Sequence, residues 1–123
     1  MALTPSWTYK LGYSQGIISA LQRRTAATEA AHLITYLKAT STILDLGCGP
    51  GSITVGLAQI ASKGCIVGVD ISAVSLALAQ KHADDVRAKV ASQSGQLGNI
   101  RFEELDVLQG LPFEEGSFDV VYS

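Results

Sequence analysis

The sequence predicts an α/β fold with a doubly wound parallel sheet. Short apolar, β-branched runs alternate with longer segments in which apolar residues recur every three or four positions. This is the pattern of strands and helices following one another in turn. The run at residues 65–70 is β-branched and apolar up to its terminal acid, as expected of a parallel strand that is covered on both faces. A glycine-rich turn directly follows the first run, where a strand would pass into a helix.

This pattern divides the chain into two regions. Residues 1–41 are expected to form an N-terminal helical region. Within it, residues 14–39 favour two helices with a break near Arg24 and Thr25, because Thr25 can cap the second helix. Residues 42–123 are expected to form the sheet domain. Only the N-terminal part of this domain, with about four strands, is expected in the chain.

Strands and helices alternate in the second region. The expected strands are 42–46, 65–70, 100–105 and 118–122, and the expected helices are 51–61 and 73–90. Ser72 is well placed to cap the second of these helices. The apolar positions that share its inward face are Leu76, Ala79, Ala83, Val86 and Val90.

The composition limits the class of protein. The 123 residues are 47% hydrophobic with a net charge of −2, and the longest basic cluster, Arg23-Arg24, is too short to indicate nucleic-acid binding. No apolar run approaches the roughly 20 residues of a membrane span, and no signal peptide is evident. We therefore expect a cytoplasmic protein without a membrane partner. Cys48 and Cys65 lack zinc-ligand spacing, so we expect reduced thiols and no metal site.

Three alternating glycines, Gly47, Gly49 and Gly51, follow the first expected strand. Glycine costs backbone entropy, so this run predicts a turn that a ligand approaches closely. Backbone amides at the start of the next helix form a positive pole that suits an anionic group. A dinucleotide-binding turn would read G-x-G-x-x-G, whereas residue 52 is serine. The spacing therefore disfavours a pyrophosphate.

An acidic residue lies at or next to the carboxyl end of each of the first three expected strands. In a doubly wound sheet these carboxyl ends share one edge. Asp45 precedes the glycines and either stabilises the turn or faces a ligand's ammonium group. Asp70 ends the second strand and either caps the next helix or accepts hydrogen bonds from a ribose, with Ile71 placed to cover a base. Asp106 is either a surface residue or an acceptor for an adenine amine, beside the amide of Val107. S-adenosylmethionine carries all of the matching groups and no phosphate, which favours it over NAD.

Several of these stretches resemble known motifs. ILDLGCGPGSIT resembles motif I of the class I S-adenosylmethionine-dependent methyltransferases, whose fold is Rossmann-like, and VGVDIS resembles their acidic-loop motif. LDVLQGLPFEEGSFDVVYS resembles the third and fourth motifs, in the wording usual for the group related to the ubiquinone/menaquinone C-methyltransferases. The resemblance runs from about Thr25 to Ser123.

The resemblance implies a role for each matching residue. Those that would line the methionine part of the cofactor are Gly47, Cys48, Gly49 and Gly51, with Asp45 near its amino group. Asp70 would bind the ribose, and the residues that would contact the adenine are Ile71, Asp106 and Val107. Ser123 would lie near the sulfonium. The N-terminal region would act as a lid, with candidate residues Tyr9, Tyr13, Arg24 and Thr25.

The chain departs from the family at its end, because the family's domain has seven strands and this chain stops after the fourth. We therefore expect a truncated chain that lacks most of the acceptor pocket and exposes its fourth strand, through which it could self-associate. The expected function is methylation of a small molecule, with no catalytic residue identified. The alternatives are a non-catalytic half-domain that associates with another chain and, less favoured, an NAD-binding half-domain.

Overall fold

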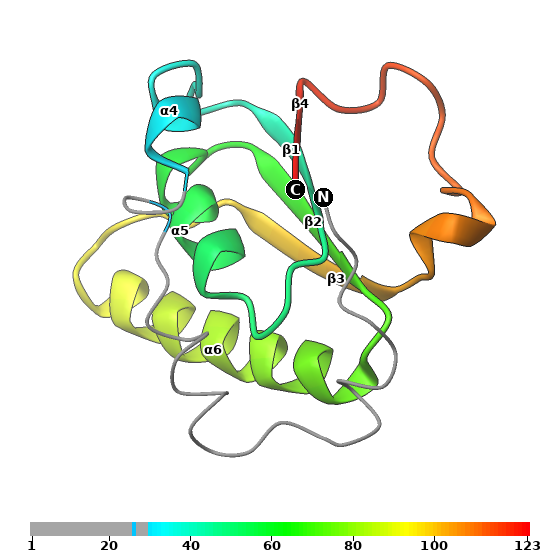
Figure 1. Cartoon of the computed structure of the whole chain (residues 1–123). Helices are drawn as coiled ribbons and strands as arrows, with labels where there is room; N and C mark the ends of the chain where they lie inside the picture. The colour runs from blue at the N-terminus through cyan, green and yellow to red at the C-terminus, as the bar shows by residue number, and fades with distance from the viewer. Residues whose placement is uncertain (1–25, 27–29) are drawn as a thin grey trace.

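A computed structural model describes Ala26 and residues 30–123 of the chain (Figure 1). Its elements are α4 (Ala31–Ile34), β1 (Thr42–Leu46), α5 (Ser52–Ile60), β2 (Cys65–Asp70), α6 (Ala73–Ser92), β3 (Asn99–Glu104), the 3₁₀ helix η1 (Val107–Gln109) and β4 (Val120–Tyr122). The expected helix break at Arg24 and the candidate lid residues lie outside the described residues. Within those residues, none of the helices combines the length and the apolar character that crossing a bilayer requires.

The four strands form one parallel sheet in the order β3-β2-β1-β4. The chain crosses from β1 through α5 to β2 and through α6 to β3, always in the same direction, and then returns to the other side of β1 (Figure 1). The strand order therefore reverses between β1 and β4, which confirms the predicted doubly wound arrangement. In such sheets ligands bind at the carboxyl edge near this reversal.

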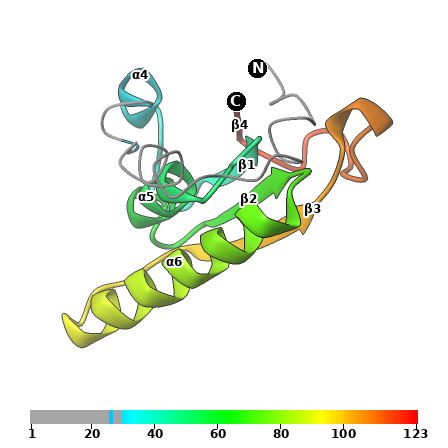
Figure 2. The same cartoon turned by 60° about the horizontal axis from the view of Figure 1, so that its bottom comes forward.

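Each face of the sheet carries its own apolar layer. On one face, Ile43 and Ile66 pack with residues of α5 such as Leu57, and Figures 1 and 2 show α5 and α6 side by side against this face. On the other face, Leu44, Val67 and Val69 form a second cluster. It is covered in part by Phe113 and Phe118, whose rings meet edge to face at 5.2 Å. Burial on both faces explains why β1 and β2 are mostly apolar, with Asp45 and Asp70 as buried exceptions near their carboxyl ends.

The boundaries of β1, β2 and the start of α6 agree with the sequence, whereas the helix expected to run to about residue 39 ends at Ile34. The bounds of β1 and β2 match the expected strands, and Ser72 caps α6 by accepting a hydrogen bond from the Ser75 amide at 3.2 Å. Helix α6 continues to Ser92. Ala79 and Ala83 are buried as expected, but so is Ser75, which an apolar stripe does not reveal.

The last two strands differ from the expected ranges. β3 runs one residue earlier than 100–105, and β4 spans three residues instead of 118–122. Strand β4 starts late because Asp119 is engaged with the start of β1. Its amide donates to the carbonyl oxygen of Thr42 and its carboxylate accepts from the Thr42 amide, both at 2.9 Å.

Candidate functional site

The glycine turn is folded against the end of β2. The amides of Gly47 and Cys48 both donate to the carbonyl oxygen of Val69, at 2.8 and 2.9 Å. Gly49 and Gly51 have φ values of 56° and 85°, in the left-handed region that glycine adopts without a side-chain clash. The backbone conformation alone therefore favours glycine at both positions.

The surroundings of Gly49 and Gly51 differ. A Cβ atom built on Gly49 would meet nothing within 4 Å, so the turn is open to an approaching group at this position. A Cβ atom on Gly51 would lie 2.8 Å from the Cβ atom of Ala79 in α6. Gly51 thus allows two helices to come together, a packing role that the sequence analysis did not foresee. Its contact with a cofactor stays a prediction.

Asp70 joins three of the segments that the sequence analysis assigned to the site. One carboxylate oxygen accepts from the Gly49 amide and the other from the Ser72 amide, each at 2.9 Å. Its carbonyl oxygen accepts from the amide of Leu105 at 3.0 Å, just before Asp106. The side chain is only 3% exposed. The glycine turn, the start of α6 and the end of β3 therefore meet at one residue on the carboxyl edge, as the sequence predicted.

A buried polar group lies at the base of the turn. The hydroxyl of Thr54 in α5 donates to Asp45 Oδ2 at 2.6 Å, and the two residues are 0% and 2% exposed. Burial, and then the negative charges of Asp45 and Asp70, raise the pKa of the Cys48 thiol far above its usual range. Cys48 is therefore a neutral thiol and a poor nucleophile at physiological pH. The Asp45 carboxylate is thus bonded to the first turn of α5, and its role towards a cofactor stays a prediction.

Sequence analysis missed Thr54. It lies in the first turn of α5, on the face of the sheet to which the Asp45 side chain also points. A hydroxyl residue in the first helical turn after a strand-end acid is a usable signal for such a pair. It is easily overlooked, because threonine at this position also reads as a helix start.

The predicted adenine contacts lie after β2 and β3. Asp106 comes after the end of β3 and is half-buried, and its Oδ1 atom accepts from the Leu108 amide at 2.9 Å, which starts η1. Val107 packs partly against the cluster of Leu44. Ile71 is 41% exposed at the start of the loop into α6. Its apolar surface is thus available to a flat ring, while Asp106 already has a role in its own turn.

Ser123 follows β4, beside the end of β1. The register pairs Asp45 of β1 with Tyr122 of β4, so Ser123 lies at the same carboxyl edge as the glycine turn. It is exposed. The structure therefore places every predicted cofactor residue on or next to this edge.

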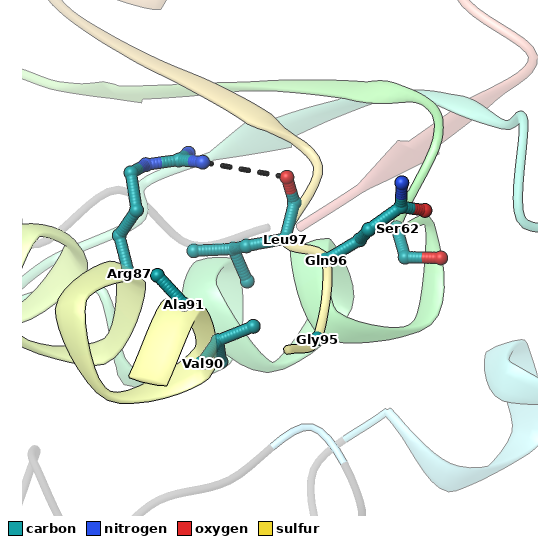
Figure 3. A pocket seen from close by; sticks show the side chains of 7 residues that line it. All are labelled: Ser62, Arg87, Val90, Ala91, Gly95, Gln96 and Leu97. Carbon is teal, nitrogen blue, oxygen red and sulfur yellow. Dashed lines mark hydrogen bonds between the residues drawn. The ribbon is translucent and has the colours of Figure 1, made fainter. Parts of the chain in front are cut away.

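A hollow of about 280 Å³ lies at the opposite, amino edge of the sheet (Figure 3). Its lining residues are Ser62, Arg87, Val90, Ala91, Gly95, Gln96 and Leu97. The Arg87 guanidinium donates to the carbonyl oxygens of Gly98 at 2.9 Å and Leu97 at 3.4 Å, which ties α6 to the loop before β3. None of the predicted cofactor residues lines this hollow, so it is separate from the candidate site.

Comparison with known proteins identifies the family. A family described as a methyltransferase domain matches residues 37–123. The probable methyltransferase ltbC of Aspergillus luteorubrus is 45% identical over 114 residues, which cover 93% of this chain and 39% of the relative. An uncharacterised methyltransferase of Schizosaccharomyces pombe is 33% identical over 118 residues, covering 93% of this chain and 41% of that protein. The chain thus spans about two fifths of the length of these relatives.

A solved structure shows the same fold. PKMT2 from Rickettsia typhi, in complex with AdoHcy, is 28% identical and superposes with a TM-score of 0.54 over 69% of this chain and 15% of that one. The fold, the carboxyl-edge arrangement and the sequence similarity agree with one another. The chain belongs to the methyltransferase domain family.

Proposed function

We propose that this chain supplies the cofactor-binding part of an S-adenosylmethionine-dependent methyltransferase that acts on a small molecule. The observation that carries the proposal is the meeting of the glycine turn, the start of α6 and the end of β3 at Asp70. Family membership and a structural relative with bound AdoHcy support the choice of cofactor.

The methionine end of the cofactor is assigned to the glycine turn. Its carboxylate would approach at Gly49, where a Cβ atom would have no neighbour within 4 Å. The other lining residues are Gly47, Cys48 and Gly51. The ammonium group of the cofactor would be attracted by the negative charge of Asp45, which lies at the start of the turn. Ser123 would lie near the sulfonium.

The adenosine end is assigned to the neighbouring strand ends. An ionised carboxylate accepts about four hydrogen bonds, so Asp70 can serve the ribose hydroxyls in addition to its two backbone amides. Ile71 would cover one face of the adenine. Asp106 and Val107 would contact its edge.

Held by the glycine turn and Asp70, S-adenosylmethionine would supply an electrophilic methyl group: the acceptor's electron pair would bond to its carbon, and the pair of the broken carbon–sulfur bond would leave with sulfur. The leaving group is already activated by the sulfonium charge. The protein therefore contributes chiefly by aligning the two reactants and excluding water.

For the acceptor, a narrower proposal is a quinone-like ring. Demethylmenaquinone methyltransferases of Lactobacillus johnsonii and Lactococcus lactis are among the similar proteins. So are methyltransferases named for trans-aconitate and arsenite. The proposal of a quinone-like ring rests on the resemblance of residues 105–123 to the motifs of the ubiquinone/menaquinone C-methyltransferase group.

Calorimetry with S-adenosylhomocysteine tests the proposed function, using a folded protein that contains this chain. We expect saturable binding and a markedly weaker interaction with NAD. Ile71→Ala should lower the affinity about tenfold, since it removes roughly 50 Å² of apolar contact. Val74→Ala is the matched control, because Val74 is also an exposed aliphatic residue at the start of α6. Absence of binding, or tighter binding of NAD, would refute the proposal.

A further inference from the structure

The glycine turn is pinned at two points by two carboxylates. Asp70 holds its tip through the Gly49 amide, and Asp45 holds its base through the hydroxyl of Thr54. The Thr54–Asp45 bond joins the end of β1 to the first turn of α5, so it closes the segment that contains all three glycines. At 2.6 Å between oxygen atoms it has the length of a hydrogen bond to a charged acceptor.

The proton of the Thr54 hydroxyl has two nearby acceptors. One is the Asp45 carboxylate, and the other is the sulfur of Cys48, which also interacts with Thr54. A hydroxyl has one proton to donate. Burial, Asp45 and Asp70 raise the pKa of Cys48, so the thiol stays protonated and competes poorly as an acceptor. The Thr54 hydroxyl therefore donates its hydrogen bond to the Asp45 carboxylate.

The side chain of Thr54 is suited to holding a fixed direction. A β-branched residue in a helix has few accessible χ1 rotamers, and Thr54 is fully buried. The hydroxyl thus orients the carboxylate with little freedom of its own. A carboxylate can accept further hydrogen bonds while it accepts this one, so the contact does not compete with a cofactor.

We propose that Thr54 is a positioning residue that selects for the amino-acid end of the cofactor by fixing the Asp45 carboxylate beneath the glycine turn. This inference rests on the proposed function, since it assumes that Asp45 acts on the cofactor's ammonium group. Thr54 itself touches no part of the cofactor. Its effect is confined to ligands that carry the ammonium group.

The test compares two ligands that share the adenosine part. S-adenosylhomocysteine carries the amino-acid end, and 5′-methylthioadenosine lacks it. Thr54→Val keeps the shape and removes the hydroxyl, so we expect it to weaken S-adenosylhomocysteine about tenfold, as for loss of one charge-assisted hydrogen bond. Binding of 5′-methylthioadenosine should stay within about twofold, and Thr54→Ser should restore most of the lost affinity. Thr35→Val is the matched control, because Thr35 is an exposed threonine at the end of α4.

Each outcome has a defined meaning. Equal weakening of both ligands by Thr54→Val, or unchanged binding of both, overturns the inference. Failure of the unaltered protein to bind S-adenosylhomocysteine overturns the proposed function, and this inference with it. If Thr54→Val does not fold, Thr54→Cys replaces it as a small variant with a weak donor. It should weaken S-adenosylhomocysteine selectively, and a parallel loss for both ligands would again refute the positioning role.

Discussion

Replacing Asp70 with alanine removes a carboxylate that accepts hydrogen bonds from two backbone amides, those of Gly49 and Ser72. A hydrogen bond to a charged group contributes about 1.5–3 kcal/mol net. The bond to Ser72 is buried and should be lost at this full value. The Gly49 amide is only partly buried, so water can replace much of its bond, and roughly 1 kcal/mol is expected there. The sum is about 2.5–4 kcal/mol, a large part of a typical domain stability of 5–15 kcal/mol.

Urea denaturation measures this loss of stability. The dependence of the unfolding free energy on urea concentration should not change. The free energy of unfolding of Asp70→Asn should lie between those of the unaltered protein and Asp70→Ala. The asparagine side chain has a single amide oxygen, which can accept from only one of the two backbone amides. Asp85→Ala is the control: Asp85 is exposed and pairs with Lys81 one helical turn away, a contact worth about 0.5 kcal/mol or less. A loss below about 1 kcal/mol for Asp70→Ala, or one equal to that of the control, would refute the role of Asp70 as a structural junction.

Three other residues give independent tests. Gly51→Ala should cost about 1–3 kcal/mol more than Gly49→Ala, because only Gly51 adds a clash with α6 to its left-handed backbone; equal costs in urea would contradict the packing role. Cys65 should be alkylated before Cys48 at pH 8, as read by mass spectrometry, because the pKa of the Cys48 thiol is raised by burial and then by its acidic neighbours. Because the folded protein keeps the Cys48 thiol protonated, the contribution of Cys48 to stability is fully present below the ordinary pKa of 9.0 and is lost progressively above it. A free energy of unfolding that stays constant from pH 9 to 10.5 would contradict the raised pKa. The pKa of Asp119 is lowered by a backbone hydrogen bond from β1, so its contribution is present above pH 3.8 and is lost in acid; Asp119→Asn should speed amide exchange in β4 at pH 6, and unchanged exchange would contradict this.

Much of the fold could be predicted from the sequence. Strands 42–46 and 65–70 were predicted with their observed bounds because both faces of each strand are buried, which makes most of their residues apolar. Ser72 was recognised as a cap because helix starts have a local chemical signature. The alternation of strands and helices predicted the parallel, doubly wound sheet, whereas the position of the reversal, between β1 and β4, is known only from the structure.

The missed features depend on contacts between distant segments. The start of β4 is set by Asp119, which bonds to Thr42 at the other end of the sheet domain's sequence. Ser75 is buried because α6 packs closely at that level, which its own polarity does not suggest. Thr54 is a local exception: it lies only nine positions after Asp45 and was missed because a threonine in the first turn of a helix also indicates a helix start. The roles of the cofactor residues remain predictions that the binding experiments above would test.

The paired bonds between Asp119 and Thr42 also bear on the order of folding. They join residues 77 positions apart, whereas Thr42 of β1 meets its β2 partner, Cys65, much closer along the chain. Closing the longer loop costs about 1 kcal/mol more in chain entropy, and β4 offers only three residues in return. We therefore expect β1, α5 and β2 to assemble first and β4 to join last. Pulsed hydrogen exchange during refolding would show β1 and β2 protected before β4, and simultaneous protection would contradict this order. Because β4 forms one side of the carboxyl edge proposed for the cofactor, that edge would be complete only after β4 has docked.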